Sequence, residues 1–295
     1  MAGLDRPTAL IIADSRGRLR AAVAKATALL RAAEIDSPEV NALRLAEYVT
    51  GVRPVLTVAE LPDDFETRYF RLVGERAAHI PLQLLVGTAG FRYLEVAVEP
   101  GVFIPRPETE LVAGAAIAEA LECDSPLVVD LCTGTGVIAL AVATEVPTAR
   151  VIAVDLSPAA ADLARRNATA IGADVDVRTG DVADPQLLTE LYGTVDVLVA
   201  NPPYVPPGEI AQLEVREHDP ELALFGGGPD GLAVPAQVIT AAARLLKLGG
   251  LLVMEHDETQ GAAARDLVEK TGAFEAARTH QDLTGRDRFL TARRR

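Results

Sequence analysis

The spacing of apolar residues divides the chain into a helical first part and an alternating remainder. In the N-terminal part apolar residues recur every three or four positions, and they predict one helix over residues 18–33. A second helix is predicted from Pro38 to about Gly51, and a third begins at Pro62, because proline is typical of the first turn of a helix. We therefore expect an N-terminal helical domain over residues 1–86.

The apolar period changes from helical spacing to two between Gly87 and Arg106. Apolar and polar residues roughly alternate over residues 91–98, and the turn sequence Glu99-Pro100-Gly101 follows. This pattern predicts a β-hairpin or an extended linker over residues 87–106. The chain returns to helical spacing from Pro107.

Short apolar runs alternate with helical segments after Pro126, and such runs are typical of buried parallel strands. The predicted strands cover residues 127–131, 151–155, 175–178, 195–200 and 250–255, with two more within 274–292. The predicted intervening helices cover residues 136–144, 157–171, 232–246 and 259–271. Strands that alternate with helices indicate an α/β fold with a doubly wound, mostly parallel sheet.

Composition and charge narrow the class of protein. The 295 residues are 49% apolar, which is enough to exclude disorder as the main state. The formal net charge of −14 argues against a protein that holds long nucleic acid by neutralising phosphates. With two cysteines and no apolar run of about 18 residues, we expect a reduced, cytoplasmic protein without a membrane segment, a disulfide framework or a metal site.

A glycine-rich turn follows the first predicted strand and opens a helix. Glycines in such a turn let the backbone approach a ligand closely. Asp155 stands nineteen residues after Gly136, at the end of the next strand, where a carboxylate can accept hydrogen bonds from ribose hydroxyls. Asp181 follows the third strand and suits an adenine amino group, although a plain Gly-Asp turn is an alternative. The expected cofactor contacts are Cys132, Thr133, Gly134, Thr135, Gly136, Asp155, Asp181, Val182 and Asn201.

These residues predict a nucleoside-containing cofactor but do not distinguish NAD from S-adenosylmethionine. The tetrapeptide Asn201-Pro202-Pro203-Tyr204, directly after the fourth strand, makes that distinction. An asparagine oxygen and a proline carbonyl can accept both N–H bonds of a planar NH₂ group, fix its nitrogen near a methyl donor and favour the positive charge that develops there. The two prolines stiffen the loop, and Tyr204 offers a ring face to a flat amide or base. Taken alone, the tetrapeptide would equally suit a simple turn.

Together these motifs resemble the release-factor glutamine N5-methyltransferases, the HemK-type enzymes. The resemblance extends over nearly the whole catalytic part and its approach, at residues 81–87, 103–110, 132–136, 155, 201–204, 214–216, 223–224, 231–232 and 285–288. It implies a seven-stranded class I methyltransferase fold over residues 107–295 and an N-terminal domain that docks the substrate. It also implies methyl transfer from S-adenosyl-L-methionine to the glutamine of the Gly-Gly-Gln motif of class 1 peptide chain release factors.

The resemblance also assigns residue roles. It makes Asn201, Pro202, Pro203 and Tyr204 both catalytic and substrate-binding. We also expect Arg106 and Glu108 to organise the rim of the substrate slot, with ion pairing within the linker as the alternative. Two positions depart from the family pattern. Cys132 stands where the family has glycine, and we expect its thiol to pack rather than react. We expect His256, in a segment where the family has more glycine, on the surface or in the cleft and not as a base.

Three other functions fit parts of the sequence. An amino-methyltransferase acting on adenine or guanine in DNA or RNA shares the Asn-Pro-Pro-Tyr motif, but residues 201–235 carry six acidic residues and one basic residue, whereas the first 31 residues have a net charge of +4. A nicotinamide dehydrogenase would leave the tetrapeptide unexplained. A non-catalytic S-adenosylmethionine-binding module would not require it.

Overall fold

The computed structural model describes residues 6–208 and 213–295 and divides into two compact units, Met1–Gly87 and Thr88–Arg295. Each unit has its own buried core. Within the described ranges, no helix combines the length and the apolar character that crossing a membrane requires.

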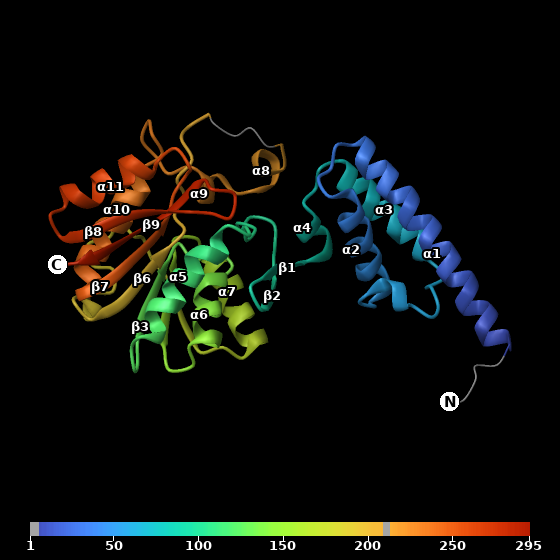
Figure 1. Cartoon of the computed structure of the whole chain (residues 1–295), viewed down its shortest axis with the longest axis horizontal. Helices are drawn as coiled ribbons and strands as arrows, with labels where there is room; N and C mark the ends of the chain where they lie inside the picture. The colour runs from blue at the N-terminus through green and yellow to red at the C-terminus, as the bar shows by residue number, and fades with distance from the viewer. Residues whose placement is uncertain (1–5, 209–212) are drawn as a thin grey trace. The chain divides into compact units, whose positions relative to one another are not determined.

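The N-terminal unit is helical. Its elements are α1 (Arg6–Ala32), α2 (Pro38–Thr50), the 3₁₀ turn η1 (Val55–Thr57), α3 (Phe65–Ala77) and α4 (Leu82–Val86) (Figure 1). Helix α1 begins at Arg6 rather than at the expected residue 18, and Pro7 lies in its first turn, where a proline is tolerated because no backbone N–H is needed. Phe65 and Tyr69 stack at the centre of the core, and the Tyr69 hydroxyl donates a hydrogen bond of 2.8 Å to the Ala42 carbonyl.

A two-stranded hairpin opens the second unit. Strands β1 (Thr88–Phe91) and β2 (Leu94–Ala97) pair antiparallel. Arg92, at the turn, pairs through two bonds of 2.6 and 2.7 Å with Glu145. The Asn167 side chain bonds both the N–H and the carbonyl of Ala97. The hairpin is therefore packed against the helices of the second unit.

The second unit contains a seven-stranded sheet in the order β5-β4-β3-β6-β7-β9-β8, in which β9 runs antiparallel to both neighbours. The strands are β3 (Leu127–Leu131), β4 (Arg150–Asp155), β5 (Val175–Thr179), β6 (Val195–Ala200), β7 (Leu246–Glu255), β8 (Phe274–Gln281) and β9 (Asp287–Arg294). The helices are α5 (Thr109–Leu121), α6 (Val137–Glu145), α7 (Pro158–Ile171), α8 (Leu213–His218), α9 (Glu221–Leu224), α10 (Ala233–Leu245) and α11 (Gly261–Lys270), with the 3₁₀ turn η2 (Thr189–Leu191).

Helices cover both faces of this sheet. Helices α5, α6 and α7 lie together on one face, and α10 packs with α11 against the other (Figure 1). The central strands are buried on both sides, which explains their continuous apolar runs. Strand β7 begins at Leu246, earlier than the predicted residue 250, because Leu246 pairs with Val195 before a register irregularity.

The register of the four central parallel strands brings four side chains to one edge. Leu131 pairs with Val154 on one side and with Ala200 on the other, and Ala200 pairs with Met254. The next residue on each strand is therefore level with its neighbours. Across β4, β3, β6 and β7 these residues are Asp155, Cys132, Asn201 and Glu255.

Candidate active site

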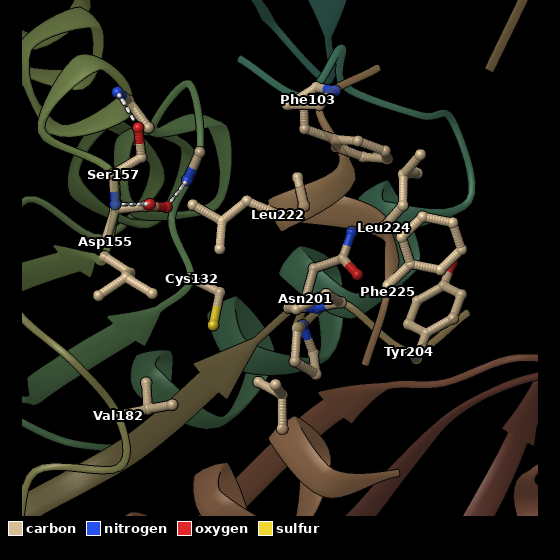
Figure 2. Close-up of a pocket in the computed structure, with 18 of the residues that line it drawn as sticks. Phe103, Cys132, Asp155, Ser157, Val182, Asn201, Tyr204, Leu222, Leu224 and Phe225 are labelled. Atoms are coloured by element: carbon tan, nitrogen blue, oxygen red, sulfur yellow. Dashed lines mark hydrogen bonds between the residues drawn. The ribbon is translucent and has the colours of Figure 1, made fainter. Parts of the chain in front are cut away.

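A cavity of about 310 Å³ lies at this carboxyl edge (Figure 2). One side carries residues of the glycine-rich turn and of the β4 and β5 ends, namely Cys132, Gly134, Asp155, Asp181 and Val182. The other side carries the tetrapeptide Asn201–Tyr204 with the apolar side chains Phe103, Leu222, Leu224 and Phe225. Both groups of residues predicted from the sequence thus border one cavity.

Asp155 ties the glycine-rich turn to the end of β4. Its Oδ2 accepts the Gly134 N–H at 2.8 Å, and its Oδ1 accepts the Ser157 N–H at 2.9 Å (Figure 2). Burial raises the pKa of this carboxyl, and the backbone donors oppose that rise. Since each carboxylate oxygen has two lone pairs, each keeps acceptor capacity for a ligand hydroxyl.

The other residues of the glycine-rich turn support its conformation and do not line the cavity. Thr133, Thr135 and Gly136 were expected to contact the cofactor but are buried and do not line the cavity. The Thr133 hydroxyl donates a 2.5 Å bond to Asp130. Gly136 has a φ of +88°, and an added Cβ would lie 3.1 Å from the Cβ of Ala164, so a side chain there would strain the turn against α7.

Cys132 adopts a φ of +62°, a conformation that favours glycine. The backbone therefore suits the glycine that the resemblance implies at this position. Burial raises the pKa of the Cys132 thiol well above its usual value, and the carboxylates of Asp155 and Asp130 raise it further. The thiol remains protonated at neutral pH and packs against the core, as a non-reactive cysteine does.

Asn201 and Tyr204 are joined by a hydrogen-bond network that reaches two residues not predicted from the sequence. The Asn201 Nδ2 donates to the Thr109 hydroxyl at 3.2 Å. Thr109 in turn donates to Oε2 of Glu255 at 2.8 Å, and the Tyr204 hydroxyl donates to Oε1 at 3.1 Å. Burial raises the pKa of Glu255 to about 7, and it raises the pKa of Tyr204 well above its usual value.

Hydrogen bonds from Gln260 and close contacts with Gly226 and Gly231 hold the backbone of the tetrapeptide; we call these contacts the clamp. The Gln260 amide donates to the carbonyls of both Tyr204 and Asp230, at 2.8 and 2.9 Å. Gly231 lies so close that an added Cβ would stand 2.2 Å from the Tyr204 oxygen. Gly226 is equally crowded, since its added Cβ would lie 2.7 Å from the Pro203 oxygen. Only glycine fits at these contacts, so the loop is held in one conformation.

Arg106 and Glu108 do not line the cavity. The Arg106 guanidinium pairs with the buried Asp219 side chain and lies over the Phe103 ring, so it supports the wall from behind. Glu108 is exposed, and its charge acts on Glu255 by raising the pKa of that buried carboxyl. Neither residue borders the cavity, and their role at the rim of a substrate slot stays a prediction.

The expectation that His256 lies on the surface or in the cleft is wrong. The side chain is fully buried and does not line the cavity, because β7 continues through Glu255 and the His256 N–H bonds the Arg288 carbonyl of β9. Its Nδ1 faces the Asp257 carbonyl at 2.8 Å. Burial lowers the pKa of the imidazole, which keeps the ring neutral.

The position of Glu255 at the site could have been predicted from the sequence. A carboxylate directly after a buried strand marked Asp155, and Glu255 ends its strand in the same way. Thr109 lies in the segment 103–110 that carries part of the family resemblance, but its contact with Asn201 spans 92 positions and depends on the fold. The apolar residues Phe103, Leu222, Leu224 and Phe225 carried no pattern that distinguishes a cavity wall from a core.

Two family models match the chain. Residues 21–87 match the PrmC N-terminal domain, and residues 94–217 match the methyltransferase small domain. The first match falls within the helical unit. The second covers the part of the second unit that contains the glycine-rich turn, Asp155 and the tetrapeptide, but not Leu222, Leu224 and Phe225 of the cavity wall.

Curated relatives match almost end to end. A release factor glutamine methyltransferase of Mycolicibacterium smegmatis is 49% identical over 94% of this chain and 98% of its own length. One from Mycobacterium tuberculosis is 45% identical over 94% of this chain and 91% of its own. This chain belongs to the release factor glutamine methyltransferase family. The assignment confirms the predicted resemblance, the enzyme class and glutamine methylation of release factors as the family's activity.

Solved structures agree with the fold. A 16S rRNA N2 methyltransferase of Thermus thermophilus, solved with AdoMet and guanosine, superposes with a TM-score of 0.50 at 20% identity, covering 70% of this chain and 50% of its own. The predicted class I methyltransferase fold, with a seven-stranded, mostly parallel sheet, is thereby confirmed.

The clamp on the tetrapeptide predicts a difference between two glycines of one loop. Gly231 and Gly228 share a left-handed φ of +73° and +70°, but an added Cβ at Gly228 meets nothing closer than 3.4 Å. Gly228→Ala should lower the free energy of unfolding by about 1 kcal/mol through backbone strain alone. Gly231→Ala should lower the free energy of unfolding by roughly 2 kcal/mol more than Gly228→Ala does, because the added Cβ overlaps the Tyr204 carbonyl. Urea unfolding of both variants measures the difference, and equal losses would contradict the clamp.

Proposed function

We propose that the cavity binds S-adenosyl-L-methionine on its Asp155 side and a glutamine side chain on its Asn201 side. The enzyme would then methylate N5 of the glutamine in the Gly-Gly-Gln motif of peptide chain release factors and leave S-adenosyl-L-homocysteine. The observation that carries this proposal is that Asp155 and the Asn201–Tyr204 tetrapeptide border one cavity.

The residues on the Asp155 side suit this cofactor. Both carboxylate oxygens of Asp155 keep acceptor capacity for the two ribose hydroxyls. Gly134 lines the cavity, and apart from its two chain neighbours no other residue has an atom within 4 Å of the place where its Cβ would stand. Val182 offers an apolar contact for a base, and Asp181 lies beside it.

The residues on the Asn201 side suit an amide. An amide nitrogen is a weak nucleophile because its lone pair is delocalised, so it needs fixing and electrostatic help. Asn201 Oδ1 and the Pro202 carbonyl would accept the two N–H bonds and favour the charge that develops on the nitrogen. When bound, S-adenosyl-L-methionine supplies an electrophilic methyl group. Phe103, Leu222, Leu224 and Phe225 would keep water from the slot.

Charge supports a protein substrate over a polyanion. Residues 201–235, several of which line the cavity, carry six acidic residues and one basic residue. A nucleic acid would meet repulsion there. We assign the helical unit, within residues 1–86, to docking of the release factor. The domain boundaries of this proposal are 1–86 for docking, 87–106 for the hairpin and 107–295 for methyl transfer.

Removing the Asp155 carboxylate tests the cofactor side. Asp155→Ala should weaken S-adenosyl-L-methionine binding by about tenfold or more, since hydrogen bonds to a charged acceptor are each worth roughly 1.5–3 kcal/mol. Calorimetric titration gives the dissociation constant. Asp162→Ala, which removes an exposed carboxylate on α7, is the matched control and should bind normally. Equal affinity of Asp155→Ala and wild type would remove Asp155 from the ribose.

The reaction itself is tested with labelled S-adenosyl-L-methionine. Three acceptors are offered separately: a release factor, the same factor with its motif glutamine changed to alanine, and duplex DNA. Label should enter only the unaltered factor. Asn201→Ala should slow the transfer by about 10²-fold, as loss of one preorganised polar contact does. Label on DNA with none on the release factor would overturn the proposal in favour of a nucleic-acid amino-methyltransferase.

A further inference from the structure

Glu255 is a buried carboxyl that the methyl transfer described above does not use. It ends β7 level with Asn201, is 2% exposed, and accepts hydrogen bonds from Thr109 and Tyr204. Thr109 also accepts the Asn201 amide N–H at 3.2 Å. Glu255 is thus joined to both polar side chains of the tetrapeptide, to one directly and to the other through a single hydroxyl.

The donors in this network have a fixed direction when Glu255 is ionised. A carboxylate only accepts, so the hydroxyls of Thr109 and Tyr204 must both donate to it. The single Thr109 hydrogen is then committed, and its oxygen can only accept from Asn201. The amide must therefore turn Nδ2 toward Thr109, which leaves Oδ1 for another partner.

We propose that Glu255 is a positioning residue whose carboxylate, acting through Thr109, fixes the Asn201 amide so that Oδ1 faces the nitrogen to be methylated. This inference rests on the proposed function, in which Asn201 Oδ1 accepts a hydrogen bond from the amide nitrogen to be methylated. Glu255 touches neither substrate nor cofactor in this scheme. It sets the direction of a hydrogen-bond chain that ends at the reacting amide.

Protonation of Glu255 removes this control. The neutral acid carries one hydrogen. When that hydrogen lies on Oε2 it is donated to Thr109, whose own hydrogen is then free to be donated to Oδ1 of Asn201, and the amide can reverse. Burial and the charge of Glu108, beside the start of α5, favour the neutral form. Arg288 of β9 and the hydroxyls of Thr109 and Tyr204 favour the charged form. The balance places the pKa of Glu255 at about 7, so transfer should weaken as pH falls below that value.

The test uses the full-length enzyme with saturating S-adenosyl-L-methionine and follows kcat from pH 6 to 9. In the wild type, kcat should fall as the pH drops through about 7 and then level off at the residual activity of the enzyme with neutral Glu255. Glu255→Gln should lower kcat by about tenfold or more at pH 8, through misorientation of Asn201, and should abolish this acid limb. The dissociation constant for S-adenosyl-L-methionine, measured by calorimetry, should stay within about twofold of wild type, since Glu255 acts on the acceptor side.

Variants of Thr109 test the connection independently of Glu255. Thr109→Val breaks the chain and should lower kcat like Glu255→Gln, whereas Thr109→Ser keeps the hydroxyl and should restore it. The double variant Glu255→Gln/Thr109→Val should be no slower than either single variant, since both cut one path. Thr144→Val is the matched control, because the Thr144 hydroxyl bonds the Leu140 and Ala141 carbonyls of its own helix α6, outside the cavity. It should leave kcat unchanged.

An acid limb that persists in Glu255→Gln, or a Thr109→Val variant with wild-type kcat, would overturn the positioning role. So would losses that multiply in the double variant. These outcomes are separate from the proposed function, which stands or falls on which acceptor the wild type labels. The profiles are measured on that acceptor, whether it is the release factor or a nucleic acid.

Discussion

The site depends on the register of four parallel strands. Because Leu131 is level with both Val154 and Ala200, and Ala200 with Met254, the residues that follow leave the sheet side by side. A shift of one residue in any pair would turn the end of that strand to the opposite face. The carboxylate proposed for the cofactor and the amide proposed for the substrate thus border one cavity because of the backbone pairing of the residues that directly precede them.

Close packing then fixes the conformation of the tetrapeptide Asn201–Tyr204 at the end of β6. Gly226 and Gly231 let a second loop touch the backbone of the tetrapeptide, and Gln260 bonds its Tyr204 carbonyl. A weak amide nucleophile gains most from groups that are already in place before it arrives. The clamp fixes the backbone of the tetrapeptide before the substrate binds. The hydrogen-bond chain through Thr109 and Glu255 fixes the side chains of Asn201 and Tyr204.

Much of this could be predicted from the sequence, because it depends on local pattern. The strand ends at Asp155 and Asn201 were marked by apolar runs followed by polar residues, and the glycine-rich turn was marked by its composition. What could not be predicted depends on contacts between distant segments. Arg106 pairs with Asp219, 113 positions away, and His256 is buried because β9 covers the end of β7. Neither partner can be identified from periodicity.

The most direct measurement is a crystal structure of the enzyme with S-adenosyl-L-homocysteine and a peptide containing Gly-Gly-Gln. The ribose hydroxyls should bond Asp155, and the glutamine nitrogen should lie within hydrogen-bond distance of Asn201 Oδ1, with Asn201 Nδ2 still on Thr109. A glutamine bound outside the cavity, or an Asn201 amide with Nδ2 turned toward the peptide, would contradict the arrangement described here.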